Sequence, residues 1–125
     1  MVKTLVSMII VFVILLCGVF YENDFVSRQF VEMQSVLEVL YDKVDSHEAT
    51  QDDVYAVQNA WIEKKKVLHI FIPHNEIKEV DLWLSESATL VRDKEWNDAI
   101  SKIEVLKELT EQIPKTFKLS WENLL

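Results

Sequence analysis

Residues 22–47 are ENDFVSRQFVEMQSVLEVLYDKVDSH, and one narrow apolar seam runs through them. The seam residues are spaced alternately four and three positions apart: Val26, Phe30, Met33, Leu37, Leu40 and Val44. This spacing has a period of about 3.5 residues, which is typical of helices in coiled coils and bundles. The stretch therefore predicts an amphipathic helix that buries one face against other helices.

The segment before this seam is strongly apolar. Residues 4–21 are TLVSMIIVFVILLCGVFY and contain no charged side chain. As a helix they have a length of roughly 27 Å, about the thickness of the hydrocarbon core of a bilayer. Phe20 and Tyr21 lie where aromatic residues are enriched at membrane interfaces. Because no Gly or Pro separates the two segments, we expect one long helix that leaves the membrane and enters the bundle.

Two alternatives to a permanent anchor stay open for this segment. A cleaved signal peptide also begins with a basic residue such as Lys3, but its apolar core is usually shorter and is followed by a small-residue cleavage site. Residues 14–17 are ILLC and resemble a lipobox, although Leu16 is larger than the residue that normally precedes a lipid-modified Cys17. We expect an uncleaved anchor that contacts the lipid bilayer through residues 4–21.

The distribution of charge predicts the orientation of this anchor. Lys3 precedes the span, whereas Glu22 and Asp24 follow it directly. The positive-inside rule then places the N-terminus in the cytoplasm and residues 22–125 outside it, in a single-pass protein of the cell membrane. The outer part carries 12 basic and 21 acidic residues, a net charge of −9.

Three further helices are predicted beyond the seam. They cover about 51–71, 76–91 and 94–113, with Thr50 and Asp53 forming a capping box and Asp93 capping the fourth helix. Pro73 and Pro114 are expected to end the second and fourth helices. Their predicted core residues are Val54, Val57, Trp61, Leu68, Ile72, Ile77, Val80, Leu84, Ala88, Val91, Trp96, Ala99, Ile103, Leu106 and Ile113.

The predicted fold is all-α, a transmembrane helix that continues into an antiparallel bundle of about four helices. It divides into an anchor at 1–21, an acidic extracytoplasmic bundle at 22–113 and a C-terminal tail at 114–125. Short connections force neighbouring helices to run antiparallel. The Pro73 turn and the tail are therefore both expected near the bilayer.

The composition excludes several classes of function. The chain has one Gly, which excludes a glycine-rich phosphate loop, and one Cys, which excludes a disulfide framework and a cysteine-based zinc site. A net charge of −8 argues against nucleic acid as a partner. His47 and Glu48 open like a zinc-protease motif, but Gln51 stands where the second histidine is required. We therefore expect no catalytic residues, no metal site, no cofactor and no enzymatic activity.

Two clusters remain as candidate sites. His74, Glu76 and Glu79 follow Pro73, and we favour a turn in which His74 and Asn75 cap the next helix while the acids complement its N-terminus. A metal site or a proton-linked switch at His74 and Glu76 is the alternative.

Lys64, Lys65 and Lys66 form the one basic run in the acidic part, and Trp121 lies in an apolar tail with flanking lysines. The lysines suit either pairing on the helix exterior or lipid phosphates. The tail suits packing on the bundle, a partner protein or lipid.

Several short motifs point to a known family. They are the Ile-Pro-His-Asn-Glu-Ile turn at 72–77, the Ile113-Pro114 pair and the closing Leu-Ser-Trp-Glu-Asn-Leu-Leu at 119–125. In these features the chain resembles the bacterial domain-of-unknown-function family 4363, small single-pass membrane proteins of spore-forming bacteria. The resemblance implies location and architecture and brings no catalytic or ligand-binding residue with it.

The sequence predicts a membrane-anchored, non-enzymatic helical bundle that acts as an interaction or accessory subunit in the bacterial cell envelope. Its expected partner is another membrane or envelope protein, and a homo-oligomer, in which the seam pairs between chains, is left open. The alternative is an extracytoplasmic helical domain that senses a ligand or ion.

Overall fold

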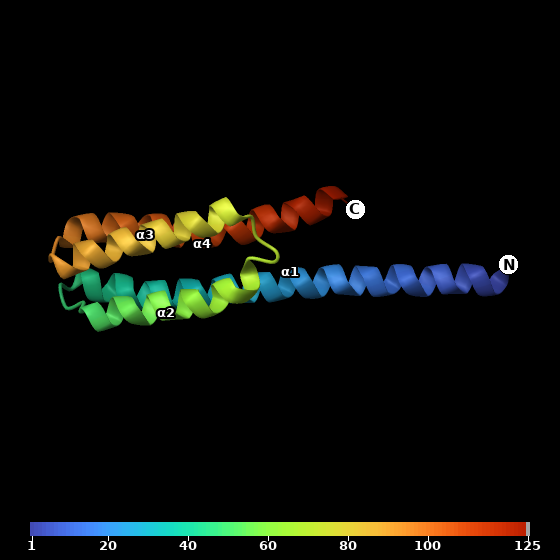
Figure 1. The fold of residues 1–125 in the computed structure, drawn as a ribbon, viewed down its shortest axis with the longest axis horizontal. Helices are drawn as coiled ribbons and strands as arrows, with labels where there is room; N and C mark the ends of the chain where they lie inside the picture. The colour runs from blue at the N-terminus through green and yellow to red at the C-terminus, as the bar shows by residue number, and fades with distance from the viewer. Residues whose placement is uncertain (125) are drawn as a thin grey trace.

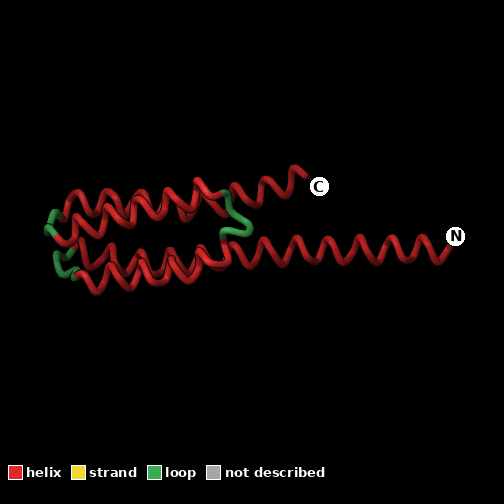
Figure 2. The backbone as a smooth tube through the Cα atoms, in the orientation of Figure 1, coloured by secondary structure: helices red, strands yellow, loops and turns green. Residues whose placement is uncertain are grey.

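The computed structural model describes residues 1–124 and confirms the predicted all-helical fold. The four helices are α1 (Val2–Asp45), α2 (Gln51–Leu68), α3 (His74–Arg92) and α4 (Trp96–Leu124). Short loops join them in an up-down-up-down order, visible in Figures 1 and 2. Each of α1 and α3 packs on both α2 and α4, so the helices close into a four-membered ring around one core.

Helix α1 is the longest element and is uninterrupted over 44 residues. Its C-terminal half belongs to the bundle, whereas its N-terminal half projects alone beyond the other helices (Figure 1). No residue before Val26 is buried. The projecting half contains the apolar segment predicted as the anchor, and it is long and apolar enough to cross a membrane.

The core confirms the predicted seam. All six seam residues are at most 1% exposed, and the five apolar residues predicted for the second helix are also buried. The buried positions of α4 likewise include Ala99, Ile103, Leu106 and Ile113. Trp96 packs against this core and stays partly exposed.

The buried face of α3 differs by one position from the prediction. Ser87 is fully buried, whereas Ala88 is only partly buried. The Ser87 hydroxyl donates a hydrogen bond to the carbonyl oxygen of Trp83 at 2.8 Å. Thr110 is buried in α4 in the same way, and its hydroxyl lies 2.9 Å from the carbonyl oxygen of Leu106. Because each hydroxyl is satisfied inside its own helix, neither leaves an unpaired polar group in the core.

Two predicted helix ends are wrong. Pro114 does not end α4, which continues to Leu124. An internal proline costs about 3 kcal/mol, but Phe117, one turn further on, packs against the core and stabilises the continued helix. Asp93 is the C-terminal cap of α3, and α4 begins only at Trp96. Both predictions depended on local sequence signals. At Pro114 the tertiary packing of the residues that follow overrides the local signal.

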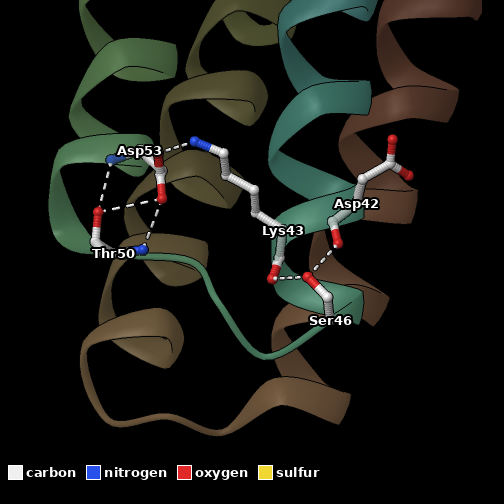
Figure 3. A network of polar contacts seen from close by, with 5 residues as sticks. All are labelled: Asp42, Lys43, Ser46, Thr50 and Asp53. Atoms are coloured by element: carbon white, nitrogen blue, oxygen red, sulfur yellow. Dashed lines mark hydrogen bonds and ion pairs between the residues drawn. The ribbon is translucent and has the colours of Figure 1, made fainter.

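The turn between α1 and α2 contains the predicted capping box, which is confirmed (Figure 3). The Thr50 backbone N–H donates to Asp53 Oδ2 at 2.8 Å, and the Asp53 N–H donates to Thr50 Oγ1 at 3.4 Å. Lys43 of α1 adds an ion pair, with its Nζ 2.6 Å from Asp53 Oδ1. The hydrogen bonds from Lys43 and from the Thr50 backbone hold the pKa of Asp53 below its usual value. This carboxylate therefore ties the start of α2 to the end of α1.

We expect Asp53→Asn to lower the free energy of unfolding by about 1 kcal/mol at pH 7, the usual scale for a lost N-terminal cap. Because the folded pKa is lowered, the carboxylate stabilises the bundle above the unfolded pKa of about 3.9, and this contribution is lost as the pH falls through the folded pKa. Thermal melts by circular dichroism at several pH values check both the loss at pH 7 and its pH dependence. We expect the difference in melting temperature between wild type and Asp53→Asn to become smaller below about pH 4. Asp52→Asn, in the same first turn, is the matched control. If Asp52→Asn and Asp53→Asn lower the free energy of unfolding equally, Asp53 does not act as a specific cap of α2.

Candidate functional site

The candidate site lies at the end of the bundle from which α1 projects. The α2–α3 loop, residues 69–73, and the last turns of α4 come together there (Figure 1). This arrangement follows from the continuation of α4 past Pro114, which brings Phe117 and Trp121 alongside the loop.

Four aromatic rings connect the three elements at this end. Phe25 of α1 lies 6.2 Å from Phe71 of the loop, measured between ring centroids. Phe71 lies 6.3 Å from Phe117, and Phe117 lies 6.2 Å from Trp121. Phe117 and Trp121 are four residues apart on α4 and therefore share one helical face.

A pocket of about 250 Å³ opens beside these rings. We call it the aromatic pocket, and it is lined by Phe71, Ile72, Pro73, Glu76, Thr116, Phe117, Ser120 and Trp121. Glu76 is the one ionisable residue of this lining. Its partial burial, with a smaller contribution from the charge of Glu79, raises the pKa of the Glu76 carboxyl. Among residues 1–124, no salt bridge is formed by this carboxylate.

His74 and Glu76, which the sequence predicts as one turn or switch site, do not share a site in the structure. Glu76 lines the aromatic pocket together with Trp121, and His74 does not. His74 is the exposed first residue of α3 and does not line the pocket. The predicted capping by His74 and Asn75 is wrong, because Pro73 occupies the N-cap position and no side chain caps α3 there. Glu76 lies in the first turn of α3, where its charge complements the helix N-terminus as expected.

The lysine run is paired within the protein. Lys64 is the most buried of the three, with 12% of its side chain exposed, and its Nζ lies 2.5 Å from Glu32 Oε2 and 3.3 Å from Gln29 Oε1. This contact lowers the pKa of Glu32 through hydrogen bonding and charge. Lys66 pairs with Glu63 at 2.9 Å on the exterior of α2.

Lys65 takes part in a contact that sequence reasoning missed. Its Nζ lies 3.3 Å from both carboxylate oxygens of Asp81 in α3. The indole N–H of Trp61 also donates to Asp81 Oδ1, at 2.7 Å. Trp61 and Lys65 are four residues apart in α2, so a single carboxylate on α3 receives both.

A second hollow, of about 470 Å³, lies between α1 and α4. Its lining includes Phe20, Asn23, Lys118 and Trp121. In the described part of the chain, the buried Oδ1 of Asn23 has no hydrogen-bond partner. Trp121 lines both this hollow and the aromatic pocket.

Residues 1–124 contain no group of three or more His, Cys, Asp or Glu side chains arranged to hold a metal ion. Cys17 is exposed on α1 and lines neither the aromatic pocket nor the second hollow. The chemical groups that line the pocket are three aromatic rings, the hydroxyls of Thr116 and Ser120 and the carboxyl group of Glu76.

Comparison with known families agrees with the resemblance seen in the sequence. Residues 20–124 match a family described as a domain of unknown function, DUF4363. The chain belongs to the DUF4363 family. The DUF4363 match begins at Phe20, so it includes the whole bundle and both walls of the aromatic pocket and leaves most of the projecting half of α1 outside. No curated protein and no solved structure matches the chain.

Proposed function

We propose that this protein is a single-pass membrane protein that holds an acidic, non-enzymatic helical bundle on the outer face of a bacterial cell membrane. There it acts as an interaction or accessory subunit for another membrane or envelope protein. The observation that carries the proposal is α1, which runs without a break from an unburied apolar segment into the bundle core.

Both the charge and the packing of the chain support this proposal. Apart from Lys3, every charged side chain lies after the apolar segment, and acids outnumber bases there. Exposed apolar side chains also occur on the bundle itself, including Val31, Val39, Ile70 and Leu119. In this proposal these exposed side chains are the candidate contacts for a protein partner.

A second candidate function is ligand sensing outside the cytoplasm. The aromatic pocket supports it, since a concave apolar site with one converging charged group is typical of small-molecule binding. In this function the ligand joins the α2–α3 loop to α4, two elements that both lie at the end of the bundle nearest the apolar segment.

The proposed topology predicts a specific labelling pattern. In a Cys17→Ala background, Ser101→Cys places a thiol on the exposed surface of α4, and Val2→Cys places one before the span while Lys3 is kept. We expect a membrane-impermeant maleimide to label position 101 in intact cells and position 2 only after permeabilisation. The reverse pattern, or labelled protein in the soluble fraction, contradicts the proposal.

The interaction role predicts a complex larger than the 14.7 kDa chain. Cross-linking in native membranes, followed by purification of a tagged chain, should give a band of fixed stoichiometry. Co-expression of two differently tagged copies tests whether that band is a homo-oligomer. Recovery of monomer alone, under conditions that trap a known membrane complex in the same sample, counts against an accessory role.

A further inference from the structure

We propose that the aromatic pocket binds a small alkylammonium cation, held by the faces of Phe71, Phe117 and Trp121 and by the carboxylate of Glu76. The pocket is built by the α2–α3 loop, the first turn of α3 and the last turns of α4, so this proposal does not rest on the topology proposed above.

The arrangement of the rings is the first support. Phe71 and Phe117 are inclined at 72° to each other, and Phe117 and Trp121 at 82°. These two edge-to-face pairs, with centroid distances of 6.3 and 6.2 Å, place three aromatic rings in the lining of one hollow. The face of an aromatic ring carries a negative potential and attracts cations, and quaternary ammonium groups are recognised by such walls.

Glu76 is the second support. Glu76 belongs to the same lining, and its carboxylate has no salt-bridge partner within the described chain. Burial disfavours the charged form of this carboxyl, as its raised pKa reflects. A bound cation compensates that charge in a site from which water is partly removed. Aromatic walls and an uncompensated carboxylate therefore both favour a positive ligand.

The neighbouring charges do not oppose this choice. Lys115 is paired with Glu111 at 3.1 Å and, with Lys118, borders the grooves between α4 and α1 rather than the aromatic pocket. Glu79, one turn after Glu76, adds negative charge nearby.

The volume of the pocket, about 250 Å³, is below that of a drug-sized site and suits a group such as trimethylammonium.

The ligand has two possible sources with the same chemistry. One is a free alkylammonium compound, and the other is the choline-type head group of a phospholipid, since the pocket residues lie on the α2–α3 loop, α3 and α4, and this loop and the end of α4 lie at the end of the bundle from which α1 projects. The experiment below separates them.

The test is calorimetric titration of choline chloride into the full chain in a non-ionic detergent. Its uncharged isostere, 3,3-dimethylbutan-1-ol, has the same shape and serves as the ligand control. We expect choline to bind at least about tenfold more tightly than the alcohol, about tenfold more weakly to Glu76→Gln, and about five- to thirtyfold more weakly to Trp121→Leu. Glu108→Gln and Trp83→Leu lie outside the pocket and are the matched variants, with affinities unchanged.

Circular dichroism shows whether each variant keeps the helical fold, and titration of Glu76→Asp, which retains the charge, replaces any variant that does not. No binding of choline, equal binding of the uncharged isostere, or an unchanged affinity in folded Glu76→Gln overturns the proposal. Repeating the titration in nanodiscs identifies the source. Loss of choline binding in phosphatidylcholine discs, but not in phosphatidylglycerol discs, supports the lipid head group, whereas equal binding in both supports the free cation.

Discussion

Trp61→Ala lowers the free energy of unfolding of the bundle by about 3–5 kcal/mol, the range for removing a large buried aromatic side chain. Trp61 is 2% exposed and lies 6.2 Å from Phe30 between ring centroids. The substitution leaves a cavity between α1 and α2. It also removes the indole N–H that donates a hydrogen bond to Asp81. Denaturant unfolding of the full chain in detergent, followed by circular dichroism, measures the loss.

Two further variants separate packing from hydrogen bonding at this position. Trp61→Phe keeps most of the apolar volume and removes the donor, and its cost is about 1–2 kcal/mol because Lys65 still contacts Asp81. Trp83→Ala removes a partly exposed tryptophan that lies beneath Lys102, and it serves as the matched control. A loss as large in Trp83→Ala as in Trp61→Ala is incompatible with Trp61 as the main aromatic residue of the core.

Two arginines in the apolar half of α1 abolish membrane retention. Each arginine at the centre of a span costs about 2.5–3.5 kcal/mol, so the pair costs about 5–7 kcal/mol. The apolar residues of the segment contribute about −4 to −7 kcal/mol in total. Ile9→Arg with Val13→Arg therefore cancels the free energy of insertion, and we expect the double variant in the soluble fraction after carbonate extraction.

The matched control places the same substitutions on the same helix outside the span. Val31 and Val39 are 63% and 56% exposed on the bundle half of α1. Val31→Arg with Val39→Arg should leave the protein in the membrane pellet. If the Ile9 and Val13 double variant also stays in that pellet, the apolar segment is not what retains the protein.

Much of the fold is predictable because its signals are local. The seam from Val26 to Val44 is a pattern within one helix, and the Thr50–Asp53 box depends on residues three positions apart. Helix ends at proline are less certain, because a local cost competes with tertiary contacts. At Pro114 the contacts of Phe117 prevail, and the predicted separate tail is instead, through Leu124, the last three turns of α4.

The aromatic pocket was less predictable from the sequence because it depends on tertiary contacts. Phe71, Glu76 and Trp121 are separated by up to 50 positions in sequence and meet only because three elements end at the same level. The four-residue spacing of Phe117 and Trp121 was the available signal, but it becomes meaningful only when α4 is taken through Pro114. Asp81, which accepts from Trp61, gave no signal that distinguished it from the other acids.

The continuity of α1 has a mechanical consequence. A helix without a hinge between its two halves transmits rotation, so the bundle inclines by the same angle as its apolar half. The bundle half of α1, from Glu22 to its end at Asp45, spans about 36 Å at 1.5 Å per residue. A typical inclination of about 20° in a bilayer thus displaces the α1–α2 turn sideways by about 12 Å. In the proposed topology, local bilayer thickness sets how far this turn reaches along the membrane surface.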